Sequence, residues 1–178
     1  VMAMRGTGIC MMAESSVQEV MDLAAVVHAT AISCRVPIIN FFDGFRTSHE
    51  LQKIEVIDYE DLRPMLDMEA VEAFRKHAMN PDNPEAVAFC EPAEVYMQHK
   101  ESLNRFYDKV PETAEKYMQM IHEITGREYH LFNYTGAPDA EYVIIAIGSG
   151  AQTIEETVRY LNEKGEKVGC INVHMFRP

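Results

Sequence analysis

The stretch with the greatest concentration of reactive side chains is the segment 43–50, which reads DGFRTSHE. It places two carboxylates, one guanidinium, one imidazole and two hydroxyls in a single short loop. Arg46 carries a planar fork of donors that suits a carboxylate or a phosphate, and the imidazole of His49 is a side chain that can serve as a proton donor or acceptor. With Asp43 and Thr47 beside them, these residues are candidates for the edge of a binding site.

A second interpretation of this loop needs no ligand. Asp43 or Glu50 would neutralise Arg46, and Ser48 or Thr47 would cap the start of a helix. Proximity in the sequence does not set the geometry, so both interpretations stay open at this level.

Two further loops and one isolated arginine qualify as candidates. Residues 14–18 supply Ser16 and Gln18, and residues 148–153 read GSGAQT after an apolar run. The latter begins like a dinucleotide fingerprint but lacks its third glycine, so a tight turn with close helix packing is the favoured interpretation. Arg5, in the polar stretch RGTG, is a candidate contributor to an anion pocket, with an ordinary loop as the alternative.

Hydrophobic periodicity predicts the elements that must hold the first two loops. An apolar run at residues 9–13 precedes Ser16, a good helix N-cap, and Glu19, which can complete a capping box. Residues 17–32 are apolar on nearly every side, as in a helix buried between layers, and residues 37–42 form a second apolar run. This order predicts a parallel βαβ unit. Because ligands of parallel sheets bind at the carboxyl ends of strands, the two loops should open on one edge.

Residues 58–126 are predicted to form a helical region. Pro64 and the NPDNP sequence at 80–84 interrupt its first half, Pro111 suits the first turn of its last helix, and Gly126 suits that helix's end. The apolar positions of this last helix follow helical spacing and are Ala114, Tyr117, Met118, Ile121 and Ile124.

A second βαβ unit is predicted after a boundary at residues 135–139. Residues 142–147 (YVIIAI) read as a strand, Thr153 as the N-cap of a helix that Gly165 ends, and Val168–Val173 as the next strand. The fold class is therefore α/β, with two parallel pieces joined by helices.

Composition excludes several classes of function. The chain of 178 residues is 47% hydrophobic and 25% charged, as expected for a globular protein and not for a disordered one. Its 16 basic and 28 acidic residues give a net charge of −12, which repels nucleic acid. No apolar run suggests a membrane span or an export signal. The four cysteines are far apart and form no CxxC pair, which favours buried thiols over zinc or iron–sulfur ligation.

Six short motifs resemble the pyruvate:ferredoxin (flavodoxin) oxidoreductases. They are SVQEVMDL at 16–23, RVP at 35–37, FFDGFRTSHE at 41–50, QKI at 52–54, YTGAPDAE at 134–141 and TIEET at 153–157. The similarity runs along nearly the whole chain, and the motif at 41–50 is long and specific.

The resemblance implies a part of a much longer enzyme. Such enzymes oxidatively decarboxylate pyruvate to acetyl-CoA and pass electrons to ferredoxin or flavodoxin. The intact enzyme is expected to be a cytoplasmic homodimer that uses thiamine diphosphate, magnesium, 4Fe-4S clusters and coenzyme A. Two alternatives stay open: an oxidoreductase for another 2-oxoacid such as 2-oxoglutarate, and a non-catalytic α/β interaction module.

The resemblance also implies a domain division. Residues 1–126 would be the end of the first domain, a partial parallel-sheet pyrimidine-binding-type domain of thiamine enzymes with the helical extension 58–126. Residues 127–178 would start the second, transketolase-C-terminal-like domain with a βαβ piece. The chain departs from the family at residues 87–90 (VAFC), where an Arg-Gly pair is usual, so any contact of that arginine is not expected here.

Most of the family's functional residues are expected elsewhere. Its catalytic glutamate would lie upstream of Val1, and its iron–sulfur and diphosphate–magnesium domains downstream of Pro178. We therefore assign no catalytic or metal-binding residue, expect no cofactor in this chain alone, and expect the isolated chain to be inactive. The candidates for the edge of the active site are Arg5, Ser16, Gln18, Asp43, Arg46, Thr47 and His49.

Overall fold

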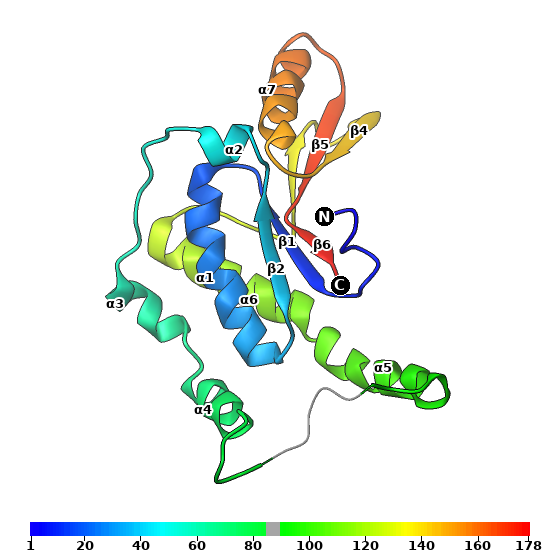
Figure 1. The fold of residues 1–178 in the computed structure, drawn as a ribbon. Helices are drawn as coiled ribbons and strands as arrows, with labels where there is room; N and C mark the ends of the chain where they lie inside the picture. The colour runs from blue at the N-terminus through cyan, green and yellow to red at the C-terminus, as the bar shows by residue number, and fades with distance from the viewer. Residues whose placement is uncertain (85–89) are drawn as a thin grey trace.

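The computed structural model describes residues 1–84 and 90–178 and shows a mixed α/β fold, as predicted (Figure 1). Residues 87–89 of the departure from the family lie outside the described residues. In chain order the elements are β1 (Cys10–Glu14), α1 (Val17–Cys34), β2 (Ile38–Phe42), α2 (Arg46–His49), α3 (Tyr59–Leu62), the 3-10 turn η1 (Arg63–Met65), α4 (Met68–Lys76), α5 (Ala93–Tyr107), α6 (Val110–Thr125), β3 (Phe132–Gly136), β4 (Tyr142–Ala146), α7 (Gly150–Glu163), β5 (Val168–Val173) and β6 (Met175–Arg177).

The first predicted βαβ unit is present. β1 and β2 are parallel, and Glu14 lies beside Phe42 in the register. β1 is the middle strand of the sheet β2-β1-β6, and all of its residues are buried. A continuous apolar run suits a strand that is covered on both faces. β6 pairs antiparallel with β1; it was not predicted, because a strand of 3 residues carries no readable periodicity.

α1 is the central helix of this half of the molecule. The side chain of Ser16 caps it by accepting the N–H of Glu19 at 3.1 Å. The other half of the predicted capping box is shifted by one residue, because the Glu19 carboxylate accepts the N–H of Ser15 at 2.6 Å. The helix passes the predicted end at residue 32 and stops at Arg35, which takes a left-handed conformation with φ 59°.

α6 closes the core against α1. Its predicted apolar stripe is confirmed: Ala114, Tyr117, Met118 and Ile121 are buried, and Ile124 packs against the same core. Facing them are buried α1 residues, among them Leu23 and Val26. Each large apolar side chain contributes about 1.5–3 kcal/mol through burial, so this contact is a main source of stability. Gly126 ends α6 with φ 75°, as predicted.

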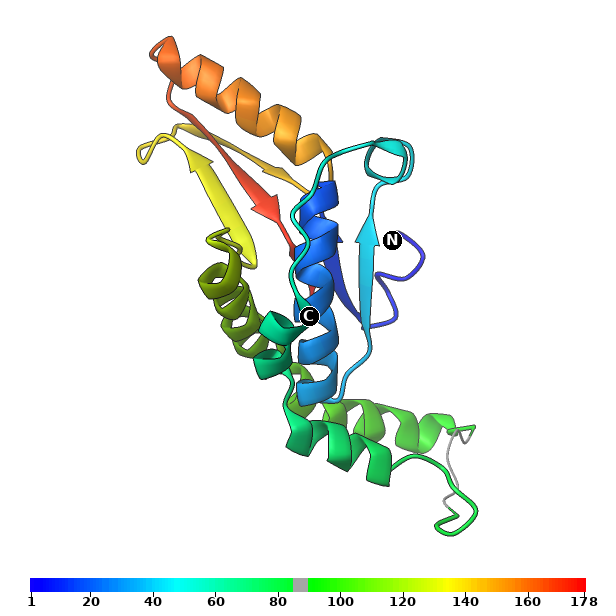
Figure 2. The ribbon, with the colours of Figure 1, turned by 90° about the vertical axis from the view of Figure 1, so that its left-hand side faces the viewer.

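Of the helices between β2 and α6, α4 and α5 form an arm at one end of the molecule (Figure 2). Pro64, the predicted interruption of the helical region, lies in η1 directly after α3, and α4 begins at Met68 after the N-cap Asp67. Neither α4 nor α5 contains a fully buried residue. α4 therefore contributes little to the core, and α5 contributes only Phe106 and Tyr107 at its end, whereas Ile57 and Met65, which precede α4, are buried in the core.

The second βαβ unit is also present, since β4 and β5 are parallel and α7 connects them. One detail of the prediction is wrong. α7 begins at Gly150 with Ser149 as its N-cap, not at Thr153, because the turn at Gly148 (φ 80°) directs the chain into the helix earlier. The strand β3, which was not predicted, ends within residues 135–139 and pairs antiparallel with β5.

The two sheets are linked by the last strands of the chain. β5 belongs to the sheet β3-β5-β4, whereas β6, two residues further on, belongs to the sheet of β1 (Figure 1). His174 lies between them, and its backbone carbonyl accepts the N–H of Ala13 at 2.7 Å. This connection brings the carboxyl end of β5 next to the carboxyl end of β1.

Candidate functional site

Asp43 joins two of the three predicted loops. Its carboxylate accepts the backbone N–H of Ser149 at 2.5 Å, at the start of α7. A Cβ atom on Gly148 would lie 2.8 Å and 2.9 Å from the two carboxylate oxygens, so only glycine allows this approach. An anion therefore does sit at the start of this helix, but it is a carboxylate of the same chain. The tight-turn interpretation of residues 148–153 fits this geometry.

Some polar side chains of the segment 43–50 are paired with other side chains of the same segment. Arg46 lies 3.9 Å from Glu50, Ser48 Oγ lies 2.8 Å from His49 Nδ1, and the rings of Phe45 and His49 stack. The half-exposed guanidinium of Arg46 keeps donors free for solvent or a ligand.

Thr47 and Ser48 do not cap α2, contrary to the second interpretation of this loop. Phe45 occupies the N-cap position with φ 65° and makes no side-chain hydrogen bond there. Thr47 is buried, and its hydroxyl oxygen has no hydrogen-bond partner among the described residues.

The remaining candidates serve different parts of the structure. Ser16 caps α1, and Gln18 ties the segment after α2 to α1 by donating to the Glu55 carbonyl at 2.9 Å and accepting the Glu55 N–H at 2.8 Å. Arg5 is exposed in the N-terminal turns, where its side chain contacts Met2 Sδ at 3.5 Å. Asp43, Arg46, Thr47 and His49 thus share the segment 43–50 but contact other residues, and Arg5 lies in the N-terminal turns.

A buried polar cluster at the junction of the two sheets was not predicted. Ser15 Oγ donates to the Glu19 carboxylate at 2.7 Å and accepts from Asn172 Nδ2 at 3.0 Å. His174 Nε2 lies 3.4 Å from the same carboxylate, and His174 Nδ1 donates to the His130 carbonyl at 2.8 Å. Burial raises the pKa of Glu19, but His174 and Ser15 outweigh it and hold that pKa below its ordinary value.

Glu14 ends β1 beside this cluster and has the most unusual environment of the described carboxyl groups. It is fully buried, and neither carboxyl oxygen has a hydrogen-bond partner within residues 1–84 and 90–178. Burial, with a smaller repulsion from Glu19, raises the pKa of Glu14 to about 9. The group is therefore protonated and neutral at pH 7. Its position directly after the apolar run at residues 9–13 is the sequence signal that could have found it.

A second network positions the segment between α2 and α3. Asp22 on α1 is fully buried and accepts from Arg127 Nε at 2.6 Å and from the Tyr129 hydroxyl at 2.8 Å. Arg127 Nη1 also donates to Glu55 at 2.6 Å. α1, the residues after α6 and the Glu55 segment are thereby held together.

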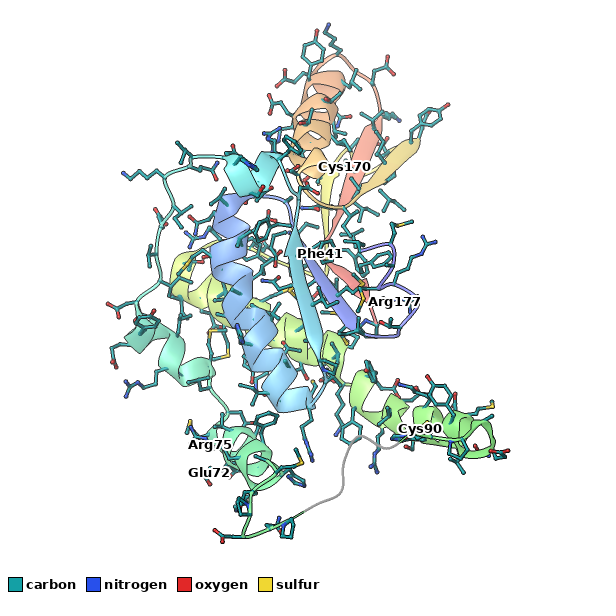
Figure 3. The ribbon with its side chains drawn as sticks, viewed as in Figure 1. Phe41, Glu72, Arg75, Cys90, Cys170 and Arg177 are labelled. Atoms are coloured by element: carbon teal, nitrogen blue, oxygen red, sulfur yellow. The ribbon has the colours of Figure 1, made fainter. Side chains whose placement is uncertain are left out.

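The described residues do not fit a metal centre. No group of three or more His, Cys, Asp or Glu side chains in this part of the chain is placed to hold a metal ion. Cys10, Cys34 and Cys170 are buried and Cys90 is exposed, and Figure 3 shows Cys90 and Cys170 in different parts of the molecule. Burial raises the pKa of Cys10 to about 11 and also raises that of Cys170.

A cavity of about 500 Å³ lies between α1 and α4, lined by residues that include His28, Arg35, Phe74 and His77; it is separate from the loop edge. Among the described residues, no helix has the length and apolar character needed to cross a membrane.

Comparison with known proteins places this arrangement in one family. Residues 1–119 match the family model described as pyruvate flavodoxin/ferredoxin oxidoreductase, thiamine diphosphate-binding. Residues 140–178 match pyruvate:ferredoxin oxidoreductase core domain II.

Individual relatives agree with the family models. The chain is 60% identical over 176 residues, 99% of its length, to a pyruvate-flavodoxin oxidoreductase of Enterobacter agglomerans. Over its whole length it is 56% identical to a pyruvate-flavodoxin oxidoreductase of Klebsiella pneumoniae and 52% identical to a pyruvate:ferredoxin oxidoreductase of Moorella thermoacetica. It spans 15% of the length of each of these relatives. The chain therefore belongs to the pyruvate flavodoxin/ferredoxin oxidoreductase family.

Proposed function

We propose that this chain acts within a pyruvate:ferredoxin (flavodoxin) oxidoreductase, a cytoplasmic homodimer that converts pyruvate and coenzyme A to acetyl-CoA and carbon dioxide. Two electrons leave in this step and pass to ferredoxin or flavodoxin. The observation that carries the proposal is the 60% identity to a pyruvate-flavodoxin oxidoreductase over 99% of the chain. Such identity across both sheets and the helices between them supports a shared fold and a shared role.

The cofactors belong to the longer protein in this proposal. Thiamine diphosphate stabilises the carbanion that remains when pyruvate loses carbon dioxide, and iron–sulfur clusters carry the electrons away. The described residues offer no metal site. Following the family resemblance, we propose that residues outside this chain hold magnesium, the diphosphate, the clusters and coenzyme A, and we derive no chemical step from this chain.

The role that we propose for this chain is to shape one edge of the active site. The segment 43–50 supports this role, because Asp43 is fixed by α7 while Arg46 and His49 remain accessible. Ser16 and Gln18 hold α1 and the Glu55 segment in place behind this edge. Arg5 is the remaining candidate and would approach from the N-terminal turns.

A chimeric enzyme tests the proposal. Residues 1–178 replace the aligned segment of the Enterobacter agglomerans relative, and the purified protein is assayed for reduction of flavodoxin that depends on pyruvate and coenzyme A. We expect turnover within about tenfold of the parent enzyme, whereas the isolated chain shows none. A folded chimera that binds thiamine diphosphate but does not oxidise pyruvate would contradict the proposal.

A further inference from the structure

Glu14 is a buried acid with no role in the proposed function. It ends β1 and is fully buried, and neither of its carboxyl oxygens accepts a hydrogen bond from the part of the chain that the structure describes. An ionised carboxylate that is buried without donors is costly, so the folded chain holds this group in its protonated form. Burial and repulsion from Glu19 accordingly raise the pKa of Glu14 to about 9.

The acidic groups around Glu14 oppose a further negative charge. β1 packs against α1, β2 and β6. On α1, Asp22 is fully buried and the side chain of Glu19 is only 14% exposed. β2 contains no titratable side chain, and Asp43, which follows it, is bound to the start of α7. Ionisation of Glu14 would therefore add a second carboxylate beside Glu19.

The basic groups near the end of β1 already have acidic partners or lie elsewhere. His174, in the link between β5 and β6, lies 3.4 Å from the Glu19 carboxylate, and Arg127 donates to Asp22 at 2.6 Å. Arg177 of β6 lies beside the first half of β1. The acid at the end of β1 therefore has no cation of its own within the described ranges 1–84 and 90–178.

Glu19 connects the end of β1 to the second sheet. Its carboxylate accepts the Ser15 N–H at 2.6 Å and the Ser15 hydroxyl at 2.7 Å. Ser15 Oγ in turn accepts from Asn172 of β5 at 3.0 Å. Like charges repel strongly where water is excluded, so a negative charge on Glu14, next to Ser15 in the chain, would push the Glu19 carboxylate out of these contacts. The connection between the two sheets at this point therefore depends on whether Glu14 is protonated.

We propose that Glu14 is a proton-operated latch, which joins the two sheets through Glu19, Ser15 and Asn172 while it is protonated and releases the end of β1 and the loop 14–18 when it loses its proton. The latch belongs to the fold of this chain, whereas its effect on the edge of the active site rests on the proposed function. The open state ionises near pH 4.5 and the closed state near pH 9, so opening releases one proton between these values. The equilibrium constant for opening therefore rises about tenfold for each pH unit in this range.

Hydrogen exchange of the 178-residue chain at pH 6 and pH 8, corrected for the intrinsic chemical rate, measures this opening. The reporters are the amides of Ala13, which donates to the His174 carbonyl, and of Ser15, which donates to Glu19. We expect their protection to fall about 100-fold between the two pH values. The amides of α6 should remain at least about tenfold better protected than these two at pH 8, because the latch opens without global unfolding.

Two matched substitutions assign the proton to Glu14. Glu14→Gln cannot ionise, so the protection of both reporter amides should be the same at pH 6 and pH 8. Glu72→Gln, an equivalent change on the exposed surface of α4 (Figure 3), should keep the fall of about 100-fold. Equal protection at both pH values in the wild type, the same fall in Glu14→Gln, or a fall that occurs only together with α6 would overturn the proposal.

Infrared spectroscopy of the wild-type chain keeps the proposal testable if Glu14→Gln does not fold. The band of a protonated carboxyl group should persist at pH 7 and fade as the pH rises past 9. A chain without this band at pH 7 would overturn the proposal. Neither measurement involves turnover, so failure of the latch leaves the result of the chimeric enzyme unchanged and is distinguished from failure of the proposed function.

Discussion

Replacing Arg127 by methionine removes the cation that neutralises buried Asp22 and keeps a side chain of similar length. Arg127 donates to both Asp22 oxygens, at 2.6 and 3.1 Å, and is itself 24% exposed. Removing one partner of a buried ion pair costs about 3–5 kcal/mol, because the other charge stays buried. Tyr129 and Gln18 still donate to Asp22. We therefore expect a loss near the lower limit, about 3 kcal/mol.

Urea and thermal unfolding followed by far-ultraviolet circular dichroism measure this loss, since the chain contains no tryptophan. For a chain of this size, about 3 kcal/mol lowers the midpoint of thermal unfolding by roughly 6–12 °C. Arg159→Met is the matched control. Its guanidinium lies 3.9 Å from Glu155 and 3.2 Å from Glu156 but is 59% exposed, so its loss should cost less than about 0.5 kcal/mol.

A double-mutant cycle with Asp22→Asn completes the test. If the ion pair causes the loss, the two single changes together cost less than the sum of their separate costs, with a coupling of about 1–3 kcal/mol. The reasoning is refuted if Arg127→Met is no more destabilising than Arg159→Met, or if the two changes simply add.

Three further predictions concern a titration, a turn and a thiol. Because the pKa of Glu14 is about 9 when folded and about 4.5 otherwise, the folded state binds the extra proton between these values. Its contribution is fully present below pH 4.5 and is lost as the pH rises toward 9, so Glu14→Gln should stabilise the protein relative to the wild type at pH 8, by up to about 5 kcal/mol, and change little at pH 4. Gly148→Ala should destabilise the chain by at least about 1–2 kcal/mol in urea unfolding, whereas Gly150→Ala, in open space at the first turn of α7, should be neutral or stabilising. Of the 4 cysteines, a thiol reagent should label Cys90 alone in the native protein and all of them in urea, as counted by mass spectrometry.

Each of these has a clear contrary result. The environment assigned to Glu14 is wrong if the wild type and Glu14→Gln show the same dependence of unfolding free energy on pH. If alanine at Gly148 and alanine at Gly150 changed the free energy of unfolding equally, the close approach of Asp43 to the turn would be contradicted. Rapid labelling of Cys10 or Cys170 in the native protein would mean that the core opens on the timescale of the reagent.

Sequence reasoning identified the two βαβ units because their strands and helices carry strong local patterns. Val168–Val173 has the predicted bounds, and α6 buries the predicted stripe. β3 and β6 were not predicted, and the reasons are physical. Phe132–Gly136 alternates weakly and ends in a turn sequence, and Met175–Arg177 is held by pairing with β1 and not by a pattern of its own.

The candidate site was predicted only in part, because the hydrogen bonds that hold it together join residues that are far apart in the sequence. The sequence placed Asp43 in a loop, but its partner Ser149 is 106 residues away. Asp22 and Arg127 are 105 residues apart, and Ser15 and Asn172 are 157 apart. No local pattern reports such pairs, so the buried cluster at the junction of the sheets could be recognised only after the fold was known.

Turnover by the chimeric oxidoreductase tests the central claim most directly. With residues 1–178 in place of the aligned segment of the Enterobacter agglomerans enzyme, acetyl-CoA formation from pyruvate should proceed with stoichiometric reduction of flavodoxin. A chimera that folds, binds its cofactors and yet forms no acetyl-CoA from pyruvate would contradict the assignment of this chain to a pyruvate oxidoreductase.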